Sequence, residues 1–397
     1  MKVSQRLSKI LFVSHTGART GAPIVLERLL KWLRENSDVE FEILLQTGGA
    51  LEPAFSALAP TLLFQLPKYQ QSIWRRILYE LGPLGEYLRA EQGKRKLLTH
   101  YKNAGIRLIY SNTITNGQIL SDLATLHCPV ICHIHELNYW INRSGPRNWD
   151  LVKNHTSHYI AASEAVKHNL LGHYGIPPER IDVIHEFVDD EVLEWSSQEP
   201  LQIRQQLNIP ESALVVGGSG AEMWRKGKDL FIQLALRVSR LSIDTPVHFI
   251  WVGKIGDAEE TYQLQHDIEH VGLSDCIHFT GEVANPMDFY AALDIFALVS
   301  REDPFPLVCL EAASLGKPIL CFEGTGGISE FVEADAGFIV PYLDIAAMAE
   351  KVALLAGDVV LRAKMGIRAA ERVRQRHHVS VAAPRIMQVI QNCIEQG

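Results

Sequence analysis

Short apolar runs alternate with amphipathic stretches along the whole chain. In the first half, the runs with the composition of buried strands cover residues 10–14, 41–46, 108–111, 130–135, 159–162 and 181–185. The stretch after the first run has Pro23 in its first turn, where proline favours the start of a helix. Its Leu26, Leu29 and Leu33 fall on one face. Strands that alternate with amphipathic helices predict a parallel α/β fold.

The second half of the chain repeats this pattern. Its predicted strands cover residues 214–218, 248–253, 277–281, 295–300, 318–322 and 337–340. Polar residues dominate 189–202, and a chain of 397 residues exceeds what one hydrophobic core normally organises. We therefore predict two doubly wound domains, 1–195 and 196–375, and a helical segment, 376–397, that packs back on the first. Such domains bind ligands in a cleft outside the carboxyl ends of their strands.

The composition is that of a globular protein, with 47% hydrophobic and 21% charged residues. A net charge of -8 argues against nucleic acid as the main partner. The six cysteines lack the paired spacing of zinc ligands and are typical of buried thiols in a reducing compartment. The first apolar run is too short for a secretory signal, and no stretch approaches the ~20 apolar residues of a membrane span. We therefore expect a cytoplasmic protein.

Two carboxylates stand out in the stretch "SREDPFPLVCLE" at residues 300–311. A strand is predicted to end before it, and Pro306 is a suitable start for the helix that follows. The first turn of a helix offers backbone N–H groups and a partial positive charge, which suit a diphosphate. Glu311 would then reach ribose hydroxyls, and Asp303 would point at a sugar. The alternative is structural: Asp303 caps the helix and Glu311 faces solvent.

Two more glycine-rich turns follow predicted strands. "GGSGAEMWRKGKDL" at 217–230 contains Gly218, Arg225 and Lys226, and "EGTGGISEFV" at 323–332 contains Glu330. Glycine lets a ligand approach the backbone closely, and a cation beside it can neutralise a phosphate. Three such turns at strand ends favour a ligand site over simple packing.

These motifs, in this order, resemble the retaining glycosyltransferases of family 4. That family has the GT-B fold, in which two Rossmann-like domains face each other across a cleft. The resemblance covers nearly the whole chain and is strongest over residues 217–340. There "FTGEVANPMDFYAALDIFALVS" is similar to the strand, helix and strand that precede the family's E-x7-E motif, and "SREDPFPLVCLE" is similar to the motif itself.

The resemblance implies a role for each of these residues. Glu311 matches the glutamate that binds the donor ribose, and Asp303 replaces the glutamate that contacts the donor sugar, a place that Glu302 is also near enough to fill. Lys226 matches the family's phosphate lysine. Arg225 would replace the arginine whose position is taken by Ala221. The residues implied to hold the diphosphate by their backbone are Phe305, Pro306, Leu307 and Val308, and those implied to line the donor site are Gly218 and Glu330.

In the first half, "PVICHIHEL" ends a predicted strand with two histidines. His135 lies nearer the carboxyl end, where an imidazole can donate to a sugar hydroxyl or exchange a proton. A core role stays open for both histidines and is favoured for His133. The resemblance places a histidine and an acidic residue near the donor sugar, matched by His135 and Glu136. It also implies that Gly21 and Ala22 border the donor phosphate and the acceptor.

Residues 68–102 are locally basic and contain interleaved apolar side chains. A peripheral helix on the anionic inner face of a membrane and a solvated amphipathic helix both fit this pattern. No Asp-x-Asp triplet occurs, so a metal-bridged diphosphate is not indicated and no metal or other cofactor is expected. Scattered histidines, such as His377 and His378, are expected at the surface.

The predicted function is the transfer of a sugar from a nucleotide-diphosphate sugar to a carbohydrate or lipid-linked hydroxyl acceptor, in polysaccharide or glycolipid assembly. The resemblance implies retention of configuration. The leaving phosphate can then accept the acceptor's proton, so His135 is expected to assist without acting as the nucleophile. Two alternatives remain: a nucleotide-sugar epimerase and a non-catalytic nucleotide- or sugar-binding protein on the same scaffold.

Overall fold

The structure is a computed structural model that describes residues 9–64, 93–196 and 200–396. The chain divides into two compact units. Unit 1 comprises Met1–Ala162, Lys167–Ile184 and Ala383–Gly397, and unit 2 comprises Ser163–Val166 and His185–Ala382. The long segment of unit 2 thus begins at His185, ten residues before the boundary at 195 that we predicted. The predicted C-terminal segment contributes its last part to unit 1.

Unit 1 is built on a parallel sheet with the strand order β3-β2-β1-β4-β5-β6-β7 among the described residues. Its strands are β1 (Lys9–Ser14), β2 (Phe41–Leu45), β3 (Thr61–Leu63), β4 (Ile106–Ser111), β5 (Val130–Ile134), β6 (His158–Ala161) and β7 (Ile181–Val183). The central strand β1 pairs Phe12 with Ile43 on one side and with Tyr110 on the other. All three side chains are fully buried, so this register lies in the core.

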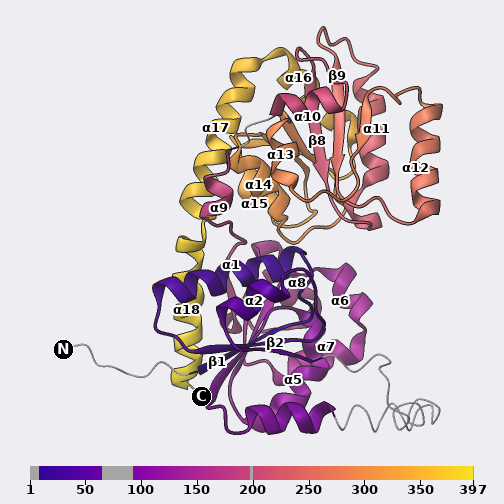
Figure 1. The fold of residues 1–397 in the computed structure, drawn as a ribbon. Coiled ribbons are helices and arrows are strands. Elements are labelled where there is room, and N and C mark those ends of the chain that lie inside the picture. The colour runs from indigo at the N-terminus through magenta and orange to yellow at the C-terminus, as the bar shows by residue number, and fades with distance from the viewer. Residues whose placement is uncertain (1–8, 65–92, 197–199, 397) are drawn as a thin grey trace. The chain divides into compact units, whose positions relative to one another are not determined.

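The helices of unit 1 lie around this sheet (Figure 1). They are α1 (Gly21–Asn36), α2 (Glu52–Leu58), α5 (Gly117–Leu123), α6 (Asn138–Ser144) and α7 (Pro146–His155). Two more, α8 (Glu164–Tyr174) and α18 (Val379–Gln396), have residues in both units. In α1 the face that contains Leu26, Leu29 and Leu33 is buried, which confirms the predicted amphipathic helix.

Unit 2 has a parallel sheet with the order β10-β9-β8-β11-β12-β13 in the part of the chain described. Its strands are β8 (Leu214–Ser219), β9 (Val247–Val252), β10 (Ile277–Phe279), β11 (Ile295–Leu298), β12 (Ile319–Phe322) and β13 (Gly337–Val340). Its helices are α9 (Asp190–Leu193), α10 (Pro200–Gln206), α11 (Lys228–Val238), α12 (Ala258–His270), α13 (Pro286–Ala291), α14 (Leu307–Ser314), α15 (Ile328–Val332), α16 (Ile345–Gly357) and α17 (Val359–Arg376). In both units the strand order reverses beside the first strand of the unit, β1 or β8, as in doubly wound sheets. This confirms the predicted fold class.

The core of unit 2 lies between its sheet and the helices that contact it. Phe231 of α11 packs edge-on against Phe249 and Trp251 of β9, with ring centroids 5.7 and 5.2 Å apart. Large buried aromatic groups of this kind supply much of the apolar area that a domain removes from water. No helix among the described residues is long and apolar enough to cross a membrane.

Candidate active site

The predicted donor residues of unit 2 lie in or next to three loops at one edge of its sheet: Gly218 ends β8, Glu311 is in α14 and Glu330 is in α15. Strands β8, β11 and β12 are neighbours, so their carboxyl ends meet there. Backbone hydrogen bonds join the three loops. Arg301 N donates to Arg225 O at 2.7 Å, Asp303 N donates to Thr325 O at 2.7 Å, and Gly327 N donates to Pro304 O at 2.8 Å. The structure therefore brings together the three turns that the sequence separates by about 100 residues.

Lys226 stands at the centre of these loops. It ends the short 3₁₀ helix η4 (Trp224–Lys226), and its Nζ donates to Asp303 Oδ2 at 2.6 Å. Glycine on either side shapes this position. A Cβ on Gly220 would lie 2.9 Å from Lys226 Cγ, and Gly227 has a φ of 77°, which other residues rarely adopt. Glycine here lets the lysine stem lie against the backbone and turns the chain into α11.

Asp303 is buried, with 5% of its surface exposed. Its Oδ2 accepts from Lys226 and from Ser300 Oγ at 3.3 Å, and its Oδ1 lies 3.6 Å from Arg225 NH1. Burial favours the neutral acid, but the charges of Lys226 and Arg225 outweigh it and hold the pKa of Asp303 below its usual range. Asp303 is therefore an ionised partner of two cations.

The alternative in which Asp303 caps the following helix is wrong. The N-cap position of α14 is held by Pro306, and no side-chain hydrogen bond caps that end among the described residues. Phe305 and Leu307 are buried, Val308 is partly exposed, and Glu311 lies one turn into the helix and is half-buried. The first turn of a helix leaves backbone N–H groups without partners inside the helix, and in α14 no side chain caps them among the described residues.

Arg225 is buried beside Lys226 and also joins two loops. Its NH1 donates to Glu302 O at 2.8 Å, and its Nε has no hydrogen-bond partner among the described residues. A buried donor without a partner costs free energy unless a ligand or water completes it. Ala221, the position expected to hold an arginine, is exposed. The structure therefore supplies Arg225 as the guanidinium nearest to Lys226 in this loop.

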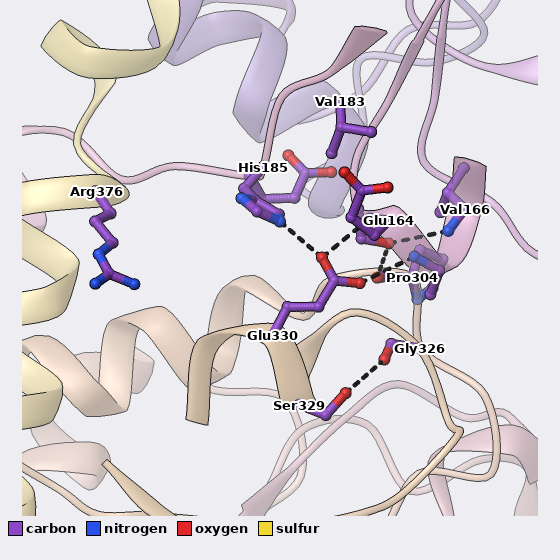
Figure 2. Close-up of polar contacts among 12 residues, drawn as sticks. Glu164, Val166, Val183, His185, Pro304, Gly326, Ser329, Glu330 and Arg376 are labelled. Atoms are coloured by element: carbon purple, nitrogen blue, oxygen red, sulfur yellow. Dashed lines mark hydrogen bonds and ion pairs between the residues drawn. The ribbon is translucent and has the colours of Figure 1, made fainter. Parts of the chain in front are cut away.

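Glu330 lies in α15 and makes contacts that the sequence did not predict. Figure 2 shows its carboxylate between His185 and the start of α8. Oε2 accepts from Glu164 N at 3.0 Å and from His185 Nε2 at 2.7 Å, and Oε1 accepts from Ala165 N at 2.9 Å. Burial raises the pKa of Glu330, but the hydrogen bond from His185 and those of the two amides lower it overall. Its predicted contact with the donor stays a prediction.

Ser163 completes this arrangement. Its Oγ accepts from Val166 N at 3.2 Å and donates to Pro304 O at 3.0 Å. Close packing surrounds this bond, because a Cβ on Gly327 would lie 2.4 Å from Ser163 Cβ. Glu330 and Ser163 together satisfy the first N–H groups of α8 and fasten the segment Ser163–Val166 to unit 2.

The prediction that His377 is a surface residue is wrong. It is 3% exposed, and its ring stacks on Phe305 with centroids 5.3 Å apart. His185 lies on the same aromatic ring at 5.0 Å. Burial, assisted by the charge of His185, lowers the pKa of His377 to about 3, so its ring is neutral at pH 7.

In unit 1 a second set of polar side chains follows β1, β4 and β5. His135 comes directly after β5, and its Nε2 lies 3.1 Å from Oδ1 of Asn112, the residue after β4. Asn112 also donates through Nδ2 to Ala22 O at 2.7 Å. His15, after β1, has its pKa lowered by burial and by the charge of His135. The predicted residues Ala22 and His135 are thus brought together by Asn112, which sequence reasoning missed along with His15.

The environment of His133 supports its core role. It is 1% exposed, its Nδ1 lies 2.8 Å from Tyr110 OH, and burial lowers its pKa well below the usual range. Glu136 is also buried, and burial raises its pKa. It accepts from Thr113 Oγ1 and from His135 N at 2.9 Å, so it orders the backbone at the end of β5.

A pocket of about 490 Å³ in unit 2 lies beside η4. Its lining is strongly acidic and consists of Met223, Trp224, Lys228, Asp229, Asp257, Glu259, Glu260, Gln263, Leu264 and Asp267. Such a lining repels a diphosphate, so this pocket is not the candidate donor site.

In the described part of the chain, no group of three His, Cys, Asp or Glu side chains is arranged to hold a metal. The predicted membrane-facing segment 68–102 lies mostly outside the described residues.

Comparisons with known proteins agree with this architecture. The family model "Glycosyltransferase Family 4" matches residues 19–192, and the model "Glycosyl transferases group 1" matches residues 201–372. In fold, the chain resembles the crystal structure of Anabaena Alr3699/HepE in complex with UDP-glucose, with a TM-score of 0.80, 23% identity, and coverage of 97% of this chain and 100% of that one.

Curated relatives match over part of their length. The lipopolysaccharide core biosynthesis glycosyltransferase LpsD of Rhizobium meliloti (strain 1021) is 28% identical over 45% of this chain and 49% of its own. The D-inositol 3-phosphate glycosyltransferase of Kribbella flavida is 26% identical over 54% of this chain and 52% of its own. The chain thus spans about half the length of these relatives.

Proposed function

Because this chain belongs to the family 4 glycosyltransferases, we propose that it transfers a sugar from a nucleotide-diphosphate sugar to a hydroxyl acceptor. One observation carries the proposal: two buried cations, Lys226 and Arg225, lie beside the loop that leads into α14, at the carboxyl ends of β8 and β11. Fixed positive charge and helix N–H groups at strand ends are what a leaving diphosphate needs.

In the proposed reaction, the bond between the anomeric carbon and the phosphate oxygen breaks while the acceptor oxygen forms a new bond to that carbon. Charge that develops on the phosphate would be stabilised by Lys226, Arg225 and the backbone of Phe305–Val308. Glu311 would accept from the ribose hydroxyls. With retention, the phosphate takes up the acceptor's proton, and no separate base is required. Because side chains supply the positive charge, we expect no metal requirement.

The relatives favour a cell-envelope acceptor. LpsD is named for lipopolysaccharide core biosynthesis, and the HepE structure contains UDP-glucose. We therefore propose a carbohydrate or lipid-linked acceptor in polysaccharide or glycolipid assembly, and UDP as the first nucleotide to test. A cytoplasmic location with peripheral membrane contact through residues 68–102 remains part of this proposal.

The test is a thermal-shift panel with UDP, GDP, ADP and CMP, repeated for Lys226→Met. A nucleotide that binds only the folded state raises the melting temperature. At a concentration of 100 times its Kd it adds about 2.7 kcal/mol to the free energy of unfolding. We expect one diphosphate to raise it for the natural chain and to lose most of that effect in Lys226→Met. The matched control is Lys364→Met, on the exposed face of α17, which should keep the full shift.

Failure of every diphosphate to shift the natural chain would contradict the proposal. Product analysis then separates the rival activities for any donor that binds. A transferase yields the free nucleotide and a sugar-acceptor conjugate, and an epimerase yields free nucleotide and an altered sugar without acceptor. A non-catalytic protein binds the donor and leaves it intact.

A further inference from the structure

We propose that Asp303 is a positioning residue, which keeps Lys226 charged and holds Lys226 and Arg225 in place for the donor diphosphate instead of contacting the donor sugar. The inference rests on the proposed function and deepens it. It also reverses the role that the sequence motif suggests for this carboxylate.

Geometry assigns Asp303 to the cations. Its Oδ2 lies 2.6 Å from Lys226 Nζ, and its Oδ1 lies 3.6 Å from Arg225 NH1, so each oxygen faces one cation. With 5% of the residue exposed, little of its surface is left to meet a sugar hydroxyl. A glutamate at this position would extend one methylene further. The shorter aspartate is therefore matched to a partner inside the loops.

The cations need this partner. The side chains of Lys226 and Arg225 are only 13% and 10% exposed, and they are adjacent in sequence. Two buried like charges without a counter-charge are strongly unfavourable, and a lysine so placed can lose its proton. Lys226 Nζ has three donor hydrogens, so the bond to Asp303 leaves others for a phosphate oxygen. Asp303 would thus hold the ammonium group of Lys226 in place and leave donor hydrogens for the phosphate.

Three titratable groups act on Lys226. Arg225 on η4 disfavours its charged form, Asp303 on the loop after β11 favours it, and Cys309 on α14 has a smaller favourable effect. Burial lowers the pKa of Lys226, and removal of Asp303 would lower it further. Above that pKa, a diphosphate could bind well only if Lys226 took up a proton.

The experiment is calorimetric titration of the full chain with UDP at pH 7.5 and pH 9, each in two buffers of different ionisation enthalpy. We expect Asp303→Asn to gain proton uptake on binding at pH 9, relative to the natural chain. Its affinity should fall more between the two pH values than that of the natural chain, by at most about thirtyfold over these 1.5 pH units, because each pH unit above a lysine pKa removes a factor of ten of the charged form. Asp303→Glu keeps the charge, so it should keep the natural pH profile, and its longer side chain should lower the affinity equally at both pH values.

A double variant gives the decisive control. In a Lys226→Met background, Asp303→Asn should cause no proton uptake, and any loss of affinity for UDP should be the same at both pH values, because it then acts through Arg225 alone. The double variant leaves one cation, Arg225, instead of two without the Asp303 carboxylate, so it is expected to fold better than Asp303→Asn alone. The proposal is overturned if Asp303→Asn binds UDP like the natural chain at both pH values but binds UDP-glucose more weakly. It is also overturned if the additional pH dependence caused by Asp303→Asn persists without Lys226. If the natural chain binds no UDP, the UDP donor proposal fails first and this inference falls with it.

Discussion

At the scale of single residues, buried neutral histidines link the stability of the protein to pH. His377 lies against Phe305, and burial lowers its pKa to about 3. In the unfolded chain the same side chain titrates near 6.5. As the pH falls below that value, His377 takes up a proton in the unfolded state but not in the folded state, so the free energy of unfolding decreases.

We predict that His377→Gln reduces this acid sensitivity. Between pH 7 and pH 5 the natural chain should lose about 2 kcal/mol of stability through His377 alone, from the 1.4 kcal/mol per pH unit that one proton represents. Glutamine has no such titration and retains a donor for Glu186 O, which His377 Nδ1 meets at 3.2 Å. Urea unfolding at the two pH values measures the difference. The exposed His173 is the matched control, and an unchanged pH dependence in His377→Gln would contradict the prediction.

At the scale of elements, Glu330 joins α15 to the first turn of α8 and to His185. Both carboxylate oxygens accept backbone N–H bonds, and Oε2 also accepts from the imidazole. Loss of a helix-capping group costs about 0.5–2 kcal/mol, and hydrogen bonds to a charged group are at the strong end of their range. This arrangement indicates a stabilising role, although the sequence motif had suggested a donor contact.

Glu330→Ala distinguishes these two roles. We expect it to lower the free energy of unfolding by about 1–2 kcal/mol, through the lost helix cap and the lost hydrogen bond from His185. The affinity for UDP should change less than twofold. Chemical denaturation and calorimetry of the same preparation give both numbers, with Glu323→Ala, at an exposed position after β12, as the control. A large loss of affinity at unchanged stability would restore the donor role.

The elements themselves were largely predictable, because strands buried on both faces of a parallel sheet appear in sequence as nearly continuous apolar runs. The edge strand β3 was missed because its residues, Thr61–Leu63, are few and only half-buried. The glycines of β8 are required for a different reason from the close approach of a ligand that we inferred. A Cβ on Gly217 would lie 2.0 Å from Leu293 Cδ1, so packing alone requires glycine there.

The candidate site was predictable in its members but not in their pairing. Asp303 and Lys226 are 77 positions apart, and no local spacing reveals that they form an ion pair. Asn112 and His15 each follow a strand among short hydroxylated residues, without a spacing that marks them as site residues. Only the strand order, which places β4 between β1 and β5, brings them near His135. Long-range pairing of this kind depends on topology rather than on composition.

At the scale of the whole molecule, the chain does not divide into two consecutive domains. Unit 1 is completed by Ala383–Gly397 from the far end of the sequence. In that segment Ile386 and Ile390 are buried, and Arg385 NH2 donates to Val183 O at 2.7 Å. All of α18 after its first four residues is therefore a structural part of unit 1, and the stability of that unit should depend on it.

Ile390→Ala tests this dependence. Truncation of a buried isoleucine costs about 2–5 kcal/mol, since it removes apolar contact and leaves a cavity. Hydrogen exchange followed along the chain should show the loss of protection in the strands of unit 1, while those of unit 2 keep theirs. Ile394→Ala, a partly exposed residue of the same type on the same helix, should have a much smaller effect. Equal loss of protection in both units would instead mean that the two unfold as one cooperative body, and the division of the chain would then have no energetic counterpart.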